Sequence, residues 1–143
     1  LDLPKSLEVL ETLGVPVIAY GQDSLPAFWS AQSELPAPLR MDTSAQIARA
    51  HAMRQQLDLP GGQLVVNPVP QAEEISQNEM APFIQTALAD AERQGIVGKA
   101  VTPFLLQRIF DLTDGRSLTA NIALVRNNAR LAAEIAQEIN TLT

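Results

Sequence analysis

Two short apolar segments constrain the fold of this chain more than any other feature. They are residues 15–20 and 63–67, each bounded by glycine or proline. Strands this apolar are typical of a parallel sheet whose two faces are both covered. Between them, Thr43 and Gln46 have capping-box spacing and predict a helix over residues 43–60. A strand, a helix and a second strand predict the βαβ unit of an α/β protein, with both strands buried.

Apolar residues recur at helical spacing in four further segments: residues 4–13, 76–95, 102–115 and 117–139. Ser76 and Glu79 form a second capping-box pair, and we expect Thr102 and Ser117 to be N-caps. Pro82 is compatible with its helix only in the first turn, where its missing N–H costs nothing. The chain therefore alternates a few strands with several helices.

The proline-rich stretch over residues 22–42 predicts an ordered loop with room for a short edge strand. With 143 residues the chain is long enough for one compact unit, or for part of one. We therefore expect residues 1–143 to form one domain portion of an α/β/α layered sandwich. Because the first residues are charged and contain a proline, they do not resemble a signal peptide.

The charge and residue content exclude several classes of function. The net charge is −6, and no run of Lys or Arg is present, so neither a nucleic-acid polymer nor a membrane is an expected partner. The chain has no cysteine and a single histidine, His51, so it offers no Cys/His zinc site and no hydroxyl–histidine triad. We interpret His51 as structural and expect a soluble, cytoplasmic protein.

Two asparagines interrupt the expected apolar face of the final helix. That face is formed by Leu118, Ile122, Val125, Ala129, Ala132 and Ile139. Asn121 and Asn128 project on the same side, and buried amides need partners. Asn121 either directs its amide at a ligand or is a core residue bonded to backbone or across a subunit contact. Spacing alone favours the second interpretation.

Three weaker candidates have plainer interpretations. Asn67 follows a strand at the end where α/β sheets bind ligands, but strand termination by the next proline explains it as well. Phe28 and Trp29 are able to stack on a base, although core packing is more common. Lys99 is able to pair with phosphate, although a lone lysine is usually solvated.

Several stretches together resemble the pseudouridine-5'-phosphate glycosidase (indigoidine synthase A-like) family. In order, they are LDLPKSLEVLETLGVPVIAYG, LPAFWS, GGQLVVNPVP, GKAVTPFLLQRI and SLTANIALVRNNARLAAEIA. The similarity runs to about Ala136 and covers only the C-terminal half of the family's protein. The sequence departs from the family pattern at Arg54-Gln55 and over residues 31–34, which affects local packing and loop contacts.

The resemblance implies an enzyme that reversibly cleaves pseudouridine 5'-phosphate to uracil and ribose 5-phosphate with a divalent metal such as manganese. It implies a Schiff-base lysine upstream of this chain, and Lys5 does not match that position. The family's acid, phosphate-binding residues and metal ligands also lie in the N-terminal half. Asn121, the asparagine of the SLxxNIxLV pattern, is the active-site residue that carries over. A homotrimer is implied as well.

Two hypotheses follow for the function of the chain. In the first, it is the C-terminal portion of a glycosidase and needs the N-terminal half for activity. In the second, it is a non-catalytic structural or interaction domain derived from the same fold.

Overall fold

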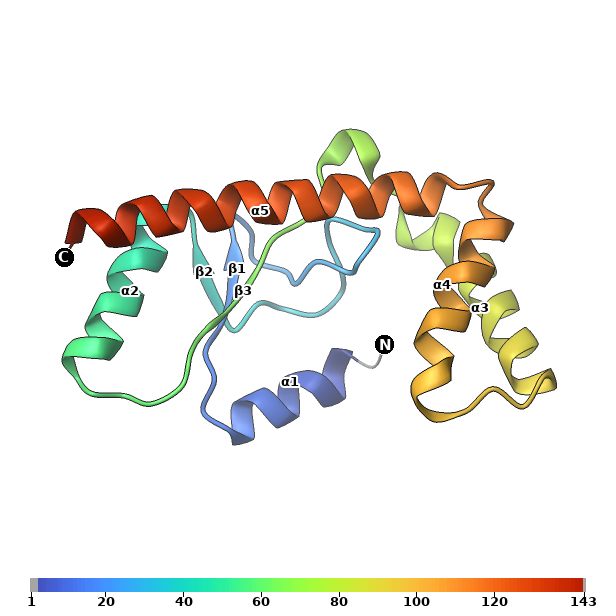
Figure 1. The fold of residues 1–143 in the computed structure, drawn as a ribbon, viewed down its shortest axis with the longest axis horizontal. Coiled ribbons are helices and arrows are strands. Elements are labelled where there is room, and N and C mark those ends of the chain that lie inside the picture. The colour runs from blue at the N-terminus through green and yellow to red at the C-terminus, as the bar shows by residue number, and fades with distance from the viewer. Residues whose placement is uncertain (1–2, 143) are drawn as a thin grey trace.

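The computed structural model describes residues 3–142, and Figure 1 shows them arranged along one long helix. In chain order the elements are α1 (Leu3–Thr12), β1 (Val17–Tyr20), β2 (Leu39–Met41), α2 (Ser44–Gln56), β3 (Leu64–Val66), the 3-10 helix η1 (Gln71–Glu73), α3 (Gln77–Arg93), the 3-10 helix η2 (Gly98–Ala100), α4 (Val101–Leu112) and α5 (Arg116–Leu142). Helix α5 spans the length of the molecule, with the sheet and α2 along one part and the α3–α4 pair at its N-terminal end.

A three-stranded parallel sheet in the order β2-β1-β3 confirms the α/β class. In the register, Ile18 of β1 lies between Leu39 of β2 and Val65 of β3. Strand β1 is buried, as predicted. The prediction that the later strand is also buried is wrong: Leu64 is 38% exposed, because β3 is an edge strand among residues 3–142. The expected edge strand in the proline-rich stretch is β2.

The capping box of α2 forms as predicted. The Thr43 hydroxyl accepts from the Gln46 backbone N–H, and the Gln46 side chain accepts from the Thr43 N–H. Together these bonds satisfy two donors at the start of the helix. Ile47 and Ala48 are then buried in the next turn, and the Gln63 amide donates to the Ile47 carbonyl at 3.3 Å. The helix is thus fixed at both its start and its buried face.

The second set of caps differs from the prediction. Ser76 caps α3, but the Glu79 carboxylate accepts from Arg116 at 2.5 Å and makes no reciprocal capping bond. Thr102 lies inside α4, because η2 leads directly into that helix. Ser117 is a buried residue of α5, and its N–H donates to the Thr113 hydroxyl at 3.2 Å. Thr113, which the sequence analysis did not identify, therefore links the end of α4 to the start of α5.

Pro82 also contradicts its prediction, because it lies in the second turn of α3 and not in the first. Its ring nitrogen cannot donate to the carbonyl four residues earlier. That carbonyl belongs to Asn78, an exposed residue, so water is able to replace the lost donor. The helix continues to Arg93 and buries Met80 and Ala87.

Helices α3, α4 and α5 enclose the main apolar cluster. Its buried members are Ile75, Met80, Ala87, Ile109 and Ala120, with Trp29 packed against them. Asp90 of α3 is 7% exposed and receives hydrogen bonds from Arg93 and from Arg108, the latter at 2.7 Å. The Asp90 carboxylate therefore joins α3 to α4.

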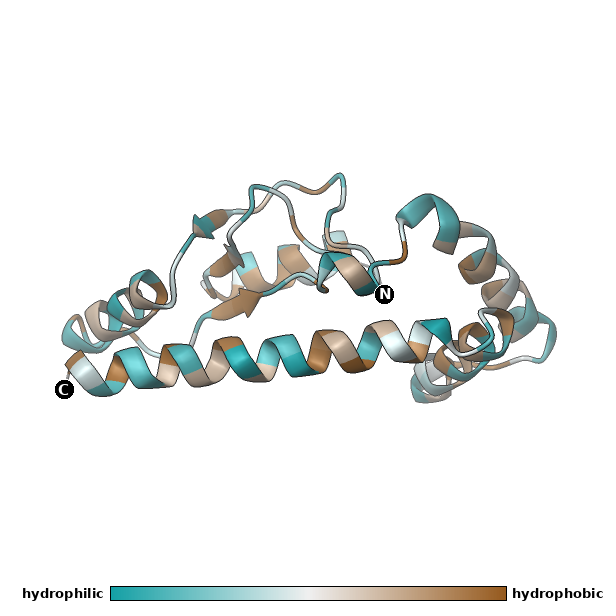
Figure 2. Ribbon diagram, turned by 90° about the horizontal axis from the view of Figure 1, so that it is seen from above, coloured by the Kyte–Doolittle hydropathy of each residue, from teal (hydrophilic) through white to brown (hydrophobic). Residues whose placement is uncertain are grey.

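The predicted apolar face of α5 is not buried. Leu118, Ile122 and Val125 are 46%, 45% and 59% exposed, whereas Ser117, Ala120 and Leu131 are buried. Figure 2 shows apolar and polar residues alternating along this helix. The rest of residues 3–142 leaves these three apolar side chains largely uncovered. None of the helices they form has the length and apolar character needed to cross a membrane.

The Asp90 contact predicts a stability effect. Asp90→Asn should lower the free energy of unfolding of the chain by about 1–2 kcal/mol, because it weakens two charge-assisted hydrogen bonds to arginine. Urea unfolding followed by circular dichroism measures the change. The exposed Asp58→Asn is the matched control and should differ little from the parent chain. Equal effects of the two substitutions would contradict the assigned role of Asp90.

Candidate functional site

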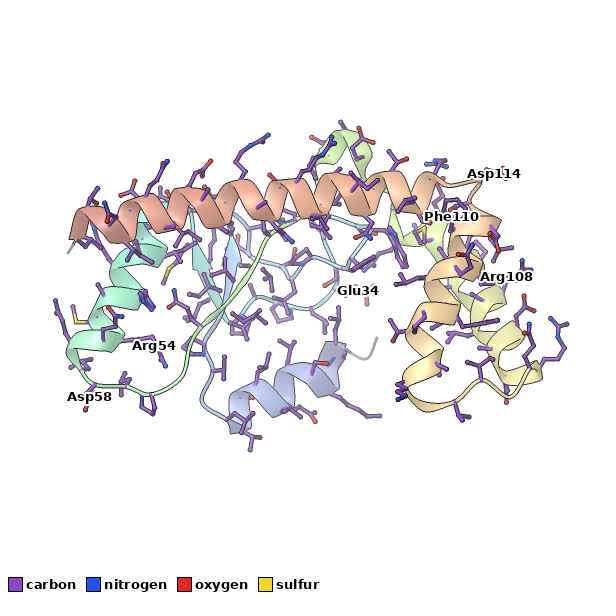
Figure 3. All side chains as sticks on the ribbon, viewed as in Figure 1. Glu34, Arg54, Asp58, Arg108, Phe110 and Asp114 are labelled. Carbon is purple, nitrogen blue, oxygen red and sulfur yellow. The ribbon has the colours of Figure 1, made fainter. Side chains whose placement is uncertain are left out.

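Two hollows lie along α5 and share Phe28 as a lining residue. The larger, about 370 Å³, is lined by Phe28, Pro103, Leu106, Gln107, Phe110, Ser117, Leu118 and Asn121. The smaller, about 180 Å³, is lined by Pro26, Phe28, Val65, Val66, Asn67, Val69, Leu124 and Asn128. Figure 3 shows Phe110 of α4 near the junction with α5. The residues that line the two hollows come from the proline-rich loop, the end of β3, α4 and α5.

Asn121 lies in the larger hollow, among the apolar side chains of Phe28, Leu106 and Phe110. It is half-buried, and among residues 3–142 its side-chain amide makes no hydrogen bond. A core asparagine would bond to nearby backbone. The amide therefore retains two donors and one acceptor for a group that enters the hollow.

The position of Phe28 is fixed by its neighbour Trp29. The two rings meet edge to face, with centroids 4.7 Å apart and an interplanar angle of 82°. The Trp29 indole N–H donates to the Ser117 carbonyl of α5 at 3.2 Å, and the Trp29 carbonyl accepts from the Ile75 N–H at 2.9 Å. Trp29 therefore packs in the core, while Phe28 faces both hollows.

The proline-rich loop that carries these two rings is ordered by hydrogen bonds, as predicted. The Ser30 hydroxyl is buried and donates to the Ile75 carbonyl at 2.7 Å. The Ala31 N–H donates to the Glu74 carboxylate at 2.8 Å, and the Gln22 amide donates to the Ala31 carbonyl at 2.8 Å. Two of these bonds involve Ala31, which begins the stretch (residues 31–34) where the sequence departs from the family pattern.

Asn67 and Asn128 both line the smaller hollow. Asn67 directly follows β3, and Asn128 is an exposed residue of α5. Between these elements the Asn127 amide donates to the Pro68 carbonyl at 3.0 Å. Sequence reasoning missed Asn127, because an i,i+1 pair of asparagines on a helix gives no sign of which one bonds to a distant segment.

No lysine, arginine or carboxylate lines either hollow. The arrangement therefore suits a neutral ring that carries hydrogen-bonding groups, and it offers no counter-charge to a phosphate. Lys99 is exposed on η2, and His51 lies within α2; neither lines a hollow. In the described part of the chain, no group of three or more His, Asp or Glu side chains is arranged to hold a metal ion.

These features define an α/β protein whose candidate site lies where a parallel strand ends beside a long helix. The chain belongs to the family of indigoidine synthase A like proteins, whose model matches residues 1–138. A pseudouridine-5'-phosphate glycosidase of Paracoccus denitrificans is 69% identical over 141 residues, which are 99% of this chain and 46% of that protein. The chain thus spans about half the length of the curated relatives it matches.

Solved structures agree with this assignment. The prealnumycin C-glycosynthase AlnA, determined in complex with ribulose 5-phosphate, matches with a TM-score of 0.88 and 32% identity over 99% of this chain and 47% of that one. An indigoidine synthase A-like protein from Thermotoga maritima matches with a TM-score of 0.83 and 32% identity, covering 95% of this chain and 44% of the other. The fold of the described residues is therefore that of one part of this family's protein.

The role of Trp29 in holding the site gives a second prediction. Trp29→Phe should lower the free energy of unfolding by about 1–2 kcal/mol, because the Ser117 carbonyl loses a donor and the ring loses volume. Circular dichroism is the suitable readout, since Trp29 is the only tryptophan. Phe28→Leu, at the partly exposed edge of the hollows, should have a smaller effect. The reverse order would contradict the assignment of Trp29 as the anchor of the loop.

Proposed function

We propose that this chain is the C-terminal part of an enzyme that reversibly cleaves pseudouridine 5'-phosphate to uracil and ribose 5-phosphate. The observation that carries the proposal is its 69% identity to a relative described as a pseudouridine-5'-phosphate glycosidase. The uncharged hollows along α5 support it, because a pyrimidine is a neutral ring edged with carbonyl and N–H groups.

In this proposal Asn121 is the active-site residue that the chain contributes. Its amide is able to donate to a base carbonyl or a sugar hydroxyl and to accept from an N–H. Its position among Phe28, Leu106 and Phe110 supports this role, because a hydrogen bond in an apolar hollow is stronger than one in water. The absence of an intramolecular partner among residues 3–142 leaves the amide available to substrate.

The N-terminal half of the family fold is the required partner. A Schiff-base lysine, a proton-transferring acid and a cationic phosphate site are needed for the reaction, and no charged side chain lines either hollow. The exposed apolar side chains of Leu118, Ile122 and Val125 are suited to burial against that half. The chain by itself is then inactive.

Manganese is the proposed metal, and its ligands are proposed to lie in the N-terminal half. The side chains of residues 3–142 do not fit the ion, because no suitable group of His, Asp or Glu gathers among them. We further propose that the complete protein is a homotrimer in the cytoplasm. These two points rest on the family resemblance.

The proposal predicts the effect of removing the Asn121 amide. The test uses a fusion enzyme, in which the N-terminal half of the Paracoccus denitrificans relative precedes this chain. Asn121→Ala should reduce kcat/KM for uracil release from pseudouridine 5'-phosphate about 100-fold, comparable to the loss of one preorganised donor in other enzymes. Uracil release is followed by chromatography.

The control for this test is Asn78→Ala, an exposed asparagine in the first turn of α3 that lines neither hollow. It should leave kcat/KM within about twofold of the parent value. Normal activity of Asn121→Ala would exclude Asn121 from the active site. A folded fusion enzyme that releases no uracil would favour the alternative, a non-catalytic structural or interaction domain.

The location of the metal gives a separate prediction. A chelator should abolish uracil release by the fusion enzyme, and manganese should restore it, whereas manganese should not change the melting temperature of this chain alone. The physical reason is linkage: an ion stabilises only a fold that binds it. A rise in the melting temperature of the chain on adding manganese would show that this part of the protein holds the ion.

A further inference from the structure

Asn67 has the one buried side-chain polar atom without a hydrogen-bond partner among residues 3–142. That atom is Nδ2, a donor, and the side chain to which it belongs lines the smaller hollow beside Val65 and Val66. Buried donors are nearly always paired in folded proteins, because an unpaired one loses its hydration without compensation. An unpaired donor on a residue that lines a hollow is therefore a candidate partner for an acceptor that enters the hollow.

The segment around Asn67 is held in place. The preceding residue, Val66, is in the parallel ladder, with Ala19 of β1 as its partner. On the other side, Asn127 of α5 donates to the Pro68 carbonyl at 3.0 Å, and Val69 is 3% exposed. Proline at position 68 also fixes φ and restricts Asn67 itself to extended backbone. The backbone at Asn67 is consequently held in place, which limits the positions that its amide is able to take.

The part of the smaller hollow that this chain forms favours a small, neutral group. Its lining is largely apolar, including Phe28, Val65 and Leu124, with the Asn128 amide as a second polar group and no positive charge. Residues 3–142 would provide no counter-ion for a phosphate or carboxylate in this hollow. The volume of about 180 Å³ is below the roughly 300–1,000 Å³ of pockets for drug-sized ligands, and it suits a single ring.

We infer that Asn67 is a specificity-determining residue that donates from Nδ2 to a carbonyl oxygen of the pyrimidine ring. This inference rests on the proposed function. The ring occupies the smaller hollow with Phe28 at its edge, and the sugar extends past Phe28 toward the larger hollow and Asn121. Asn67 forms no bond to the reacting atoms; it binds and orients the base.

The two products of the reaction provide the test, because only one of them contains the pyrimidine. In the fusion enzyme, Asn67→Asp replaces the donor by an acceptor at almost unchanged volume. It should raise the inhibition constant of uracil about tenfold or more, since a hydrogen bond becomes a repulsive contact. The inhibition constant of ribose 5-phosphate should stay within about twofold. Asn67→Ala should give the same selectivity, and the Asn78→Asp control should change neither constant.

Each outcome decides the inference. A rise in the uracil constant alone supports it. Equal changes in both constants, or no change in either, would overturn it. The uracil release of the parent fusion enzyme reports separately on the proposed function. If the parent fusion enzyme is active but Asn67→Asp does not raise the uracil constant selectively, only the Asn67 inference is rejected. An inactive parent rejects both the Asn67 inference and the proposed function.

Discussion

Helix α5 packs against α2 along one part of its length and against α4 near its start, so a single helix connects the sheet to the α3–α4 pair. Of its three buried residues, Ser117, Ala120 and Leu131, Ala120 belongs to the apolar cluster that α3 and α4 also form. The same helix lines both hollows, through Asn121 in one and Asn128 in the other. Because the position of each asparagine depends on that packing, the geometry of the candidate site is set by the placement of α5.

A second constraint is the apolar surface and the strand edge that residues 3–142 leave uncovered. Leu118, Ile122 and Val125 form an exposed apolar side of α5, and β3 is an edge strand. Exposed apolar sides and unpaired strand edges are costly in a protein that functions alone. They are accounted for if a second element packs there, and the relatives, about twice as long as this chain, contain further sequence to supply it. The hollows then become an enclosed site between two parts of one enzyme.

Local signals were sufficient to predict much of the fold. The parallel sheet, the capping box at Thr43 and the five helices follow from periodicity and short-range hydrogen bonds. Burial was predicted less well, because it depends on what packs against a face: the sequence of α5 indicates an apolar side but not whether it is covered. The same limit applies to the site. Asn121 was identified from its pattern, whereas the orphaned Nδ2 of Asn67 depends on contacts between segments far apart in the chain.

The central claim is that the asparagine-lined hollows of α5 are one wall of a pyrimidine site that the N-terminal half completes. A crystal structure of the fusion enzyme with bound uracil tests it most directly. The account predicts that the base lies against Phe28, with the Asn67 amide within hydrogen-bonding distance of a ring carbonyl and the exposed side of α5 covered by the N-terminal half. Uracil bound away from α5, with Leu118 and Val125 still exposed to solvent, would contradict the account.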